Sequence, residues 1–410
     1  MTVKVGFKQT EFGEIPANWE MVKVNNITVN HKQGYYTNKG YVENGTYLVR
    51  ITDLFNPKIK YEEMPMLNIS KRDFELFKIQ KGDFLFARSG SIGRYGIVYE
   101  DADAIFGSFI IRFNFDPKKI TNEFFGYAFE TKLVLRQLSS ITQGSSNINI
   151  NANNIKALTV PLPPLPEQHA IAAALNDVDD LLNSLDALIA KKRLIKQGAM
   201  QELLTGKRRL SGFSGDWKVK TIGEMTSATA GGTPSTLVAS YWGGKIKWMS
   251  SGELHLKRVY DVEGRITEEG LKNSSTKIIP PKCVLIGLAG QGITRGTVAI
   301  NMIELCTNQS IAAIYPSDVF IPEYLYFNLD SRYDELRSIS TGDGGRGGLN
   351  LTLIKKMEVP LPPLPEQTAI AEILSDMDAE ISALEQKREK TRLLKQGMMQ
   401  ELLTGRIRLL

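Results

Sequence analysis

The chain has 410 residues, of which 42% are hydrophobic and 23% charged, and this is the composition of an ordinary globular protein. Its length favours two or three domains, and the absence of any run of eighteen apolar residues argues against a membrane-spanning helix. The net charge of +5 suits a polyanionic partner only weakly, because many proteins without nucleic-acid partners are equally basic.

The N-terminal residues lack the apolar core of a secretory signal, and the chain contains only two cysteines. Cys283 and Cys306 both lie in apolar, strand-like runs, so we expect them to be inert core residues in a reducing compartment. Together these features favour a cytoplasmic location.

Residues 1–159 are expected to form a mixed α+β domain with glycine-rich loops. Short apolar runs bounded by turn residues predict strands, and a helical pattern follows near residues 121–138. The expected strands cover residues 47–51, 83–87, 96–99 and 109–113.

Residues 160–206 begin with the sequence VPLPPLPEQ, whose four prolines fix φ and remove backbone hydrogen-bond donors. The segment is therefore expected to be extended and unable to pair as a central strand. Glu167 and Gln168 then open a helix, because an acidic first turn suits the helix dipole. We interpret the segment as a stiff exit from the domain; a docking site for an aromatic-lined partner domain is the alternative.

The helix that follows carries apolar residues at alternating spacings of four and three, as in a coiled coil. As one helix, residues 167–204 would span ~57 Å. A similar helix ends the chain, with its pattern interrupted at Arg388, and the two are expected to pair antiparallel. Packing in a compact helical bundle is the alternative. The predicted seam residues are Ile171, Leu175, Val178, Leu182, Leu185 and Ile189 in the first helix, and Ile370, Leu374, Met377, Ile381 and Leu384 in the second.

Residues 207–358 are expected to form a second α+β domain, with a helical pattern near residues 321–337. Its expected strands cover residues 245–249, 283–287, 297–300 and 310–315. Residues 359–410 then repeat the proline segment and the long helix.

The two helical segments are copies of one sequence. Aligned without gaps at an offset of 199, residues 160–206 and 359–405 share 29 of 47 residues. The chain is therefore predicted to be a pseudo-two-fold repeat: two α+β domains separated by two long helices that form an antiparallel coiled coil. The closely similar helical segments are expected to contact the same kind of partner at two places. The two differing globular domains are expected to contact two different partners.

Weaker similarities extend into the globular parts. Residues 84–98 match 284–298 at an offset of 200, which places Gly96 opposite Gly296 and Val98 opposite Val298. Further matches pair Trp19 with Trp217 and residues 142–151 with 341–350.

The motifs that catalysis would require are missing. The sequence has no phosphate-binding loop of the G-x-x-x-x-G-K-[ST] type and no Asn/Asp-Pro-Pro-aromatic motif of a DNA methyltransferase. Its three histidines, His31, His169 and His255, are far apart, and no pair with cysteine has metal-ligand spacing. We therefore expect neither catalysis nor a metal site.

Two variable units, each followed by PLPPLPEQ and a helix that ends in KQG-x-MQELLTG, resemble the DNA specificity subunits of type I restriction–modification systems. The resemblance covers essentially the whole chain and extends to residues 13–27 and 231–254. It implies that each globular unit reads one half of a bipartite, asymmetric DNA target, and that the helices set the gap. Two domains on helices of ~57 Å could reach successive major grooves, about 34–36 Å apart.

The resemblance also implies partners. Two identical modification subunits would dock on the repeated parts, for which Glu167, Gln168, Glu366 and Gln367 are candidate contacts. Those subunits would bind S-adenosylmethionine and methylate adenine, and two restriction subunits, acting as motor and nuclease, would use ATP and magnesium. No cofactor is expected in this chain itself.

Candidate DNA-contacting residues lie in loops, where Arg, Lys, Asn, Gln, Ser, Thr and Tyr can reach base edges and phosphates. In the first unit they are Lys32, Gln33, Tyr35, Tyr36, Asn38, Lys39, Arg88, Ser89, Ser91, Arg94, Gln143, Ser145 and Asn147. In the second unit they are Thr233, Ser235, Gln291, Thr294, Arg295, Arg346 and Asn350. The four tryptophans, Trp19, Trp217, Trp242 and Trp248, are expected in the core or in helix packing.

Two other functions stay open at this point. A two-headed scaffold could bind proteins instead of DNA, and a self-sufficient DNA-modifying enzyme is disfavoured only by its missing motifs. The sequence specifies neither the half-targets nor the spacer length, the oligomeric state of the chain or the role of Arg388.

Overall fold

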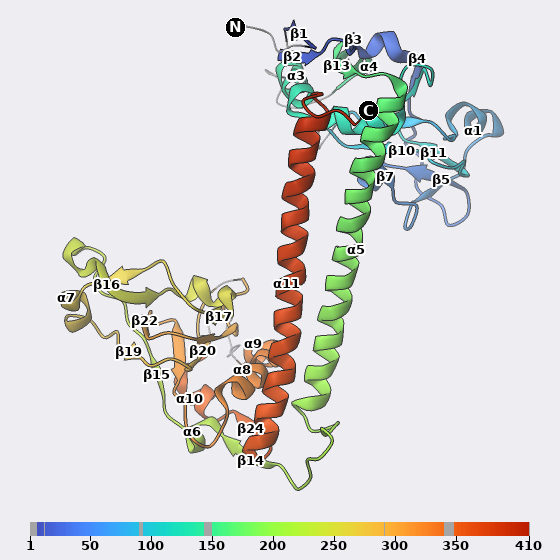
Figure 1. Cartoon of the computed structure of the whole chain (residues 1–410). Coiled ribbons are helices and arrows are strands. Elements are labelled where there is room, and N and C mark those ends of the chain that lie inside the picture. The colour runs from blue at the N-terminus through green and yellow to red at the C-terminus, as the bar shows by residue number, and fades with distance from the viewer. Residues whose placement is uncertain are drawn as a thin grey trace. The chain divides into compact units, whose positions relative to one another are not determined.

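The computed structural model describes residues 6–11, 13–89, 93–142, 150–290, 292–339 and 348–409. The chain divides into two compact units, Met1–Leu185 with Lys387–Leu410, and Asp186–Gln386. Each unit therefore combines one globular part with a portion of each long helix (Figure 1). Within the described residues, no helix is long and apolar enough to cross a membrane.

The first unit is built on a four-stranded sheet in the order β10-β9-β12-β4, with a smaller sheet β11-β5-β8 beside it. Its strands are β1 (Phe7–Thr10), β2 (Gly13–Pro16), β3 (Glu20–Lys23), β4 (Thr28–Gln33), β5 (Thr46–Val49), β6 (Leu54–Phe55), β7 (Lys58–Ile59), β8 (Met66–Leu67), β9 (Phe84–Ala87), β10 (Tyr95–Ile97), β11 (Ala104–Phe106), β12 (Ile110–Phe115) and β13 (Thr159–Leu162). Its helices are α1 (Lys71–Phe77), α2 (Asn122–Phe129), α3 (Lys132–Thr142) and α4 (Ala152–Ala157), with short 3-10 turns at Val24–Ile27 and Ile51–Asp53.

Aromatic side chains fill the main core of this unit. Phe84 and Phe86 from β9 meet Phe125 of α2 edge to face, with ring centroids 5.2 and 6.0 Å apart. All three side chains are at most 1% exposed. Such rings bury a large apolar area and fix the helix on the sheet.

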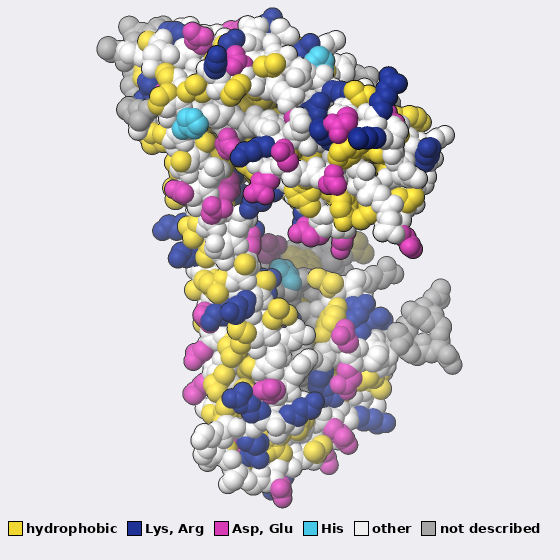
Figure 2. Space-filling model, turned by 90° about the vertical axis from the view of Figure 1, so that its right-hand side faces the viewer, with side chains coloured by type: hydrophobic (Ala, Val, Ile, Leu, Met, Phe, Trp, Pro, Cys, Tyr) yellow, Lys and Arg dark blue, Asp and Glu magenta, His cyan; other side chains and the backbone are white. Residues whose placement is uncertain are grey.

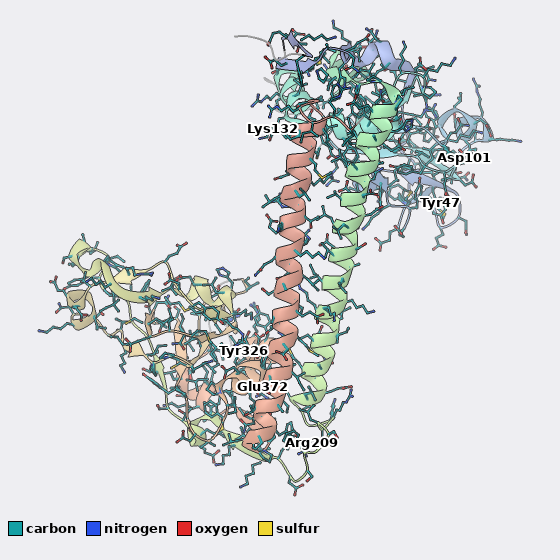
Figure 3. The ribbon with its side chains drawn as sticks, viewed as in Figure 1. Tyr47, Asp101, Lys132, Arg209, Tyr326 and Glu372 are labelled. Carbon is teal, nitrogen blue, oxygen red and sulfur yellow. The ribbon has the colours of Figure 1, made fainter. Side chains whose placement is uncertain are left out.

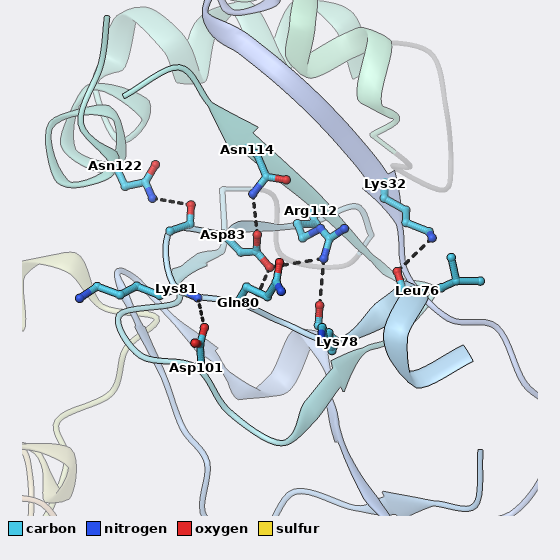
Figure 4. A network of polar contacts seen from close by, with 11 residues as sticks. Lys32, Leu76, Lys78, Gln80, Lys81, Asp83, Asp101, Arg112, Asn114 and Asn122 are labelled. Atoms are coloured by element: carbon cyan, nitrogen blue, oxygen red, sulfur yellow. Dashed lines mark hydrogen bonds and ion pairs between the residues drawn. The ribbon is translucent and has the colours of Figure 1, made fainter. Parts of the chain in front are cut away.

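A buried polar network lies next to this core (Figure 4). Asp83 accepts hydrogen bonds from Asn114 at 2.5 Å and from the backbone N–H of Gln80 at 2.8 Å, and its carboxylate lies 3.5 Å from the Arg112 guanidinium. Burial raises the pKa of Asp83 above its ordinary value, while these three partners act in the opposite direction. By strand register, the second unit has the apolar Ala313 where the first has Arg112.

Replacing Asp83 with alanine is expected to destabilise the first unit by about 3 kcal/mol, because Arg112 would be left buried without its carboxylate. Urea unfolding of the chain, with hydrogen exchange in β9 and β12 as the local readout, measures the effect. The matched control is Asp103→Ala, an exposed carboxylate nearby. Equal losses in the two variants would contradict a structural role for the buried pair.

The second unit repeats the first. Its main sheet has the order β15-β23-β20-β21-β17, and its smaller sheet the order β18-β16-β22-β19. The strands are β14 (Lys218–Thr221), β15 (Ala228–Ala230), β16 (Trp242–Met249), β17 (Arg258–Val259), β18 (Arg265–Ile266), β19 (Ile278–Ile279), β20 (Val284–Gly287), β21 (Val298–Asn301), β22 (Leu305–Thr307), β23 (Ile311–Ile314) and β24 (Glu358–Leu361). The helices are α6 (Ile222–Met225), α7 (Glu268–Lys272), α8 (Pro322–Asp330), α9 (Tyr333–Ile339) and α10 (Leu351–Lys355), with 3-10 turns at Ala239–Tyr241 and Ser251–Leu256.

The strands predicted from the sequence are all present, and the pseudo-two-fold α+β repeat is confirmed. Each predicted helical pattern, however, contains two helices: α2 and α3 in the first unit, and α8 and α9 in the second. Both cysteines are buried, as predicted, and burial raises the pKa of the Cys283 and Cys306 thiols to about 12 and about 11.

One sequence match is wrong by three residues. Strand register places Gly96 opposite Leu85, whereas in the second unit Ala299, not Gly296, lies opposite the equivalent Leu285. The connection from β20 to β21 is three residues longer than that from β9 to β10. An offset that is right before a loop therefore fails after it.

The two long helices, α5 (Leu165–Leu203) and α11 (Leu364–Leu402), have 39 residues each. Ion pairs show that they run antiparallel in both units (Figure 1): Lys395 to Asp179 at 2.7 Å in the first, and Lys196 to Asp378 at 2.5 Å in the second. The second unit adds Lys192–Glu380 and Arg193–Glu385. The predicted coiled coil is confirmed in this respect.

All eleven predicted seam residues are buried or half-buried. Ile171 and Leu175 pack in the globular core of the first unit, together with Leu402 from the end of α11. Ile370 and Leu374 occupy the matching places in the second unit. The beginning of each seam thus anchors a helix in its domain as well as pairing with the other helix.

Candidate functional site

The doubled proline segment ends in a buried carboxylate that joins three parts of the first unit. Trp19 Nε1 donates to Glu167 Oε2 at 2.9 Å, and the Arg408 guanidinium binds both oxygens of the same carboxylate, with Nη2 2.7 Å from Oε2. Glu167 is 1% exposed. We call Trp19, Glu167 and Arg408 the first latch, because it ties the domain, the start of α5 and the chain after α11 together.

The second unit contains the same arrangement at an offset of 199 for the helix residues. Arg209, labelled in Figure 3, comes from the segment after α5 and binds Glu366 with Nε and Nη2 at 2.6 and 2.7 Å. Trp217 Nε1 donates to the same carboxylate at 3.2 Å. Trp217, Glu366 and Arg209 form the second latch, in which the bidentate geometry is the strongest that an arginine and a carboxylate can adopt.

The glutamine that follows each latch glutamate is hydrogen bonded to the proline segment. Gln168 donates to the carbonyl of Pro163 at 2.9 Å and accepts from the backbone N–H of Thr121 at 2.9 Å. Gln367 donates to Pro362 and accepts from Ile321 at the same distances. Each glutamine therefore holds the extended proline segment against the first turn of α2 or α8.

A glycine turns the chain back toward each latch after the helix. Gly206 and Gly405 have φ of +72° and +70°, a conformation that other residues adopt only with strain. A Cβ on Gly405 would lie 2.3 Å from Pro16, and one on Gly206 would lie 3.4 Å from Trp217. The repeated glycine that follows both helices is thus explained by this turn.

Glu167, Gln168, Glu366 and Gln367 were predicted to contact partner subunits. All four side chains are at most 1% exposed and are hydrogen bonded within the chain. The structure therefore gives them an intramolecular role, and a docking surface has to be sought elsewhere.

The DNA candidates at residues 32–39 lie on a loop that leaves the edge strand β4. Residues 34–41, here called the first loop, correspond to residues 231–238, the second loop, which leaves the edge strand β15. Both begin with a glycine pressed against a backbone carbonyl: a Cβ on Gly34 would lie 2.1 Å from Gly107 O, and one on Gly231 would lie 2.0 Å from Thr307 O. The two groups of candidates therefore leave equivalent edge strands of their units.

In the first unit, some candidate side chains are exposed and can reach a ligand, and others are held by contacts within the chain. Lys32 donates to the carbonyl of Leu76 at 2.9 Å, and Gln33 makes a long contact of 3.4 Å to that of Ser108. Tyr35 is half-buried against Phe77. The exposed candidates of the first loop are Tyr36, Asn38 and Lys39.

The first loop borders a hollow of about 480 Å³. The hollow is also lined by Tyr41, Arg50 and Phe109, which were not predicted from the sequence to contact DNA. Arg50 is oriented by Asp53, to which it donates from Nε at 3.0 Å and from Nη2 at 2.8 Å. Arg50 was missed because it lies in a strand-like run, and Phe109 because apolar residues are expected in the core.

The remaining candidates are less accessible or lie elsewhere. Arg88, Ser89, Arg94, Thr294 and Arg295 are half-buried near the turns of the main sheets. Asn350 caps α10, since its Oδ1 accepts from Leu353 N at 2.9 Å, as Asn151 caps α4 in the first unit. Ser91, Gln143, Ser145, Asn147, Gln291 and Arg346 lie outside the described residues.

The second loop is exposed at Thr233 and Ser235, both predicted candidates, and at Leu237. Trp242 and Trp248 are half-buried against this loop instead of lying in the core, whereas Trp19 is fully buried. On the face shown in Figure 2, acidic and basic side chains alternate with apolar ones and no uniformly basic surface covers it.

A profile of the family described as the type I restriction modification DNA specificity domain matches the chain twice, at residues 16–193 and 214–394. The chain belongs to this family. A chain of Methanocaldococcus jannaschii named as the type I restriction enzyme MjaX specificity subunit is 25% identical, over 98% of this chain and 96% of its own length. The EcoR124I/EcoR124II specificity subunit of Escherichia coli is 27% identical over 54% of this chain and 56% of its own.

Solved structures agree in fold. The S subunit of a type I restriction–modification system from M. genitalium gives a TM-score of 0.62 at 17% identity, over 94% of this chain and 96% of that one. A structure from a study of assembly in a type I restriction–modification system gives 0.60 at 18% identity, over 96% and 99% of the two chains.

Each of the two family matches includes the tryptophan and the glutamate of one latch but not its arginine. Each specificity domain contains its own tryptophan and carboxylate, Trp19 with Glu167 and Trp217 with Glu366. The arginines lie outside the matches, Arg209 between them and Arg408 after the second. Each domain of this specificity chain is therefore completed by a residue that follows the helix of the other.

Proposed function

We propose that this chain is the non-catalytic DNA-specificity subunit of a cytoplasmic type I restriction–modification complex, in which its two domains read the two halves of a bipartite, asymmetric target. The observation that carries the proposal is the pair of equivalent loops. Two domains of one fold present them from the same sheet edge, yet the exposed side chains are Tyr36, Asn38, Lys39 and Tyr41 in one and Thr233, Ser235, Thr236 and Leu237 in the other. Equal scaffolds with different loops suit two different half-targets.

The chain would dock two modification subunits that carry S-adenosylmethionine and methylate adenine, and, through them, two ATP- and magnesium-dependent restriction subunits. A doubled partner needs a doubled surface, and the helices provide one. Leu194 and Ile195 on α5 are 69% and 47% exposed, and Leu393 and Leu394, which take the same places on α11, are 53% and 58% exposed. Apolar side chains appear over the long helices in Figure 2.

A methylation map tests the proposal. The chain is expressed with its modification subunit in a methylation-free host, and modified adenines are located by single-molecule sequencing. One interrupted, asymmetric motif that disappears without this chain is the expected result. A continuous motif would refute the bipartite reading, and an assembled complex without any methylation would favour a scaffold that binds proteins only.

The docking surface gives a separate prediction. Leu194→Glu is expected to reduce the number of bound modification subunits from two to one, with affinity at the altered site falling at least tenfold, because a buried leucine contributes about 1.5–3 kcal/mol. Leu393→Glu is expected to remove the other subunit, and the double variant both. Mass photometry of the DNA-free complex counts them. Ile278→Glu, at an exposed apolar residue of β19, is the control and should keep both subunits.

A further inference from the structure

Leu237 is 95% exposed, more than any other large apolar side chain in the part of the chain that the structure describes. One exposed leucine on a protein surface needs no explanation by itself. What distinguishes Leu237 is the construction of the loop that holds it in water.

Two indole side chains hold the backbone of the second loop in place. Trp248 Nε1 donates to the carbonyl of Gly232 at 2.9 Å, and Trp242 Nε1 donates to that of Ser235 at 3.1 Å. The two indole rings pack edge to face with centroids 5.0 Å apart. Both hydrogen bonds act on the backbone that leads to Leu237, so this backbone is held without help from the leucine side chain.

The start of the loop is equally constrained. A Cβ on Gly232 would lie 2.3 Å from Ser275 Oγ and 2.5 Å from the backbone nitrogen of Thr276, so only glycine fits there. Pro234 is buried, while Thr233, Ser235 and Thr236 are exposed. Thr233 Oγ1 lies 2.5 Å from Gln309 Oε1. The loop thus presents hydroxyl groups and one leucine on a pre-organised backbone.

The first loop also exposes large side chains, at positions that correspond to Thr233 and Val238 and not to Leu237. Tyr36, two residues after the equivalent glycine, is 78% exposed. Each domain therefore offers large, water-exposed side chains on the loop that leaves its sheet edge, Tyr36 and Tyr41 in the first and Leu237 in the second, and their different shapes fit the differing half-targets of the proposed function.

We propose that Leu237 contacts the C5-methyl group of a thymine in the major groove of the second half-target, and is a specificity-determining residue. This inference rests on the proposed function. The thymine methyl is the apolar group that base pairs display in the major groove, and hydroxyl side chains such as those of Ser235 and Thr236 can bond the neighbouring base edges. Methylation of adenine also requires at least one A·T pair in each half-target, so a thymine is present for the contact.

The contact is tested with the assembled modification complex and duplex oligonucleotides that carry its mapped target. Each thymine of the second half-target is replaced in turn by deoxyuridine, which removes only the methyl group. Substitution at one of these thymines is expected to weaken binding of the wild-type complex about fourfold, because burying one carbon group contributes about that much to the affinity. The Leu237→Ala complex is expected to bind thymine and deoxyuridine equally at that position.

Matched variants separate this role from general damage. Leu237→Met keeps an apolar side chain and is expected to keep the response to deoxyuridine, while Leu256→Ala removes another exposed leucine of the same unit and should change nothing. Thymines of the first half-target should respond alike in the wild type and in Leu237→Ala. Trp242→Phe, which removes one indole donor, is expected to weaken the response by loosening the loop.

Failure of the inference and failure of the proposed function give different results. If the wild-type complex binds its target specifically but no deoxyuridine weakens it, or if Leu237→Ala keeps the full response, Leu237 does not read thymine. If the complex has no sequence preference at all, the proposed function itself is wrong.

Discussion

Replacing Arg408 with alanine is expected to destabilise the first unit by about 2 kcal/mol. The loss leaves the buried carboxylate of Glu167 with Trp19 as its remaining side-chain donor. Removing one partner of a fully buried ion pair costs about 3–5 kcal/mol, and we expect less here because the Arg408 side chain is 32% exposed, so that water can take part of its place. The Glu167 carboxylate also raises the pKa of Arg408, as expected for a bidentate partner.

Hydrogen exchange of the assembled complex measures the effect and shows where it falls. Arg408→Ala is expected to speed exchange at the beginning of α5, and Arg209→Ala at the beginning of α11, so each variant is the control for the other. Arg208→Ala, at a side chain that is 75% exposed and 3.5 Å from Glu202, is expected to leave exchange unchanged at the beginning of both helices. Identical exchange patterns in Arg408→Ala and Arg209→Ala would contradict two separate latches.

A second pair of variants isolates the charge. Glu167→Gln keeps the size of the side chain but removes the negative charge, and in the Arg408→Ala background it is expected to recover part of the lost stability, because a neutral amide is less costly to bury alone. If Glu167→Gln adds to the damage instead, the carboxylate contributes through Trp19 and not through Arg408.

Much of the fold follows from the sequence because the repeat displays it directly. The 199-residue offset, the seam positions and the apolar runs predict two α+β units and two antiparallel helices, and these are present. The error came in the match of Gly96 with Gly296, since the similarity of two short segments carries no information on the length of the loop between them. Strand pairing, which depends on backbone geometry, was needed to correct it.

The role of Glu167 could not be read from the sequence for a physical reason. Charged residues are seldom fully buried, so an acidic residue after prolines is expected to be at the surface. Its partners are 148 and 241 residues away along the chain, and only the antiparallel pairing of α5 with α11 brings Arg408 to it. The exposed Leu237 was missed for the opposite reason, because an apolar side chain is expected to be buried.

Exchanging residues 20–159 for the corresponding domain of another specificity chain is expected to replace one half-target completely and leave the other half unchanged. The exchange keeps Trp19 and the proline segment with Glu167, so the first latch is preserved, and it replaces the first loop with that of the donor. A methylation map of the complex reads both halves in one experiment. A change in both half-targets would contradict modular reading.

The sharpest form of this exchange uses the chain itself. Residues 218–358, which follow Trp217 and precede the second proline segment, are placed between Trp19 and Val160, so that both domains become the same. Since the latches and the helices are repeated, the two equal domains should take pseudo-two-fold positions and read one half-target twice, in opposite directions. The expected motif is an interrupted palindrome of the original second half-target. An asymmetric motif from this chain would mean that the helical framework, and not the domain, contributes to reading the bases.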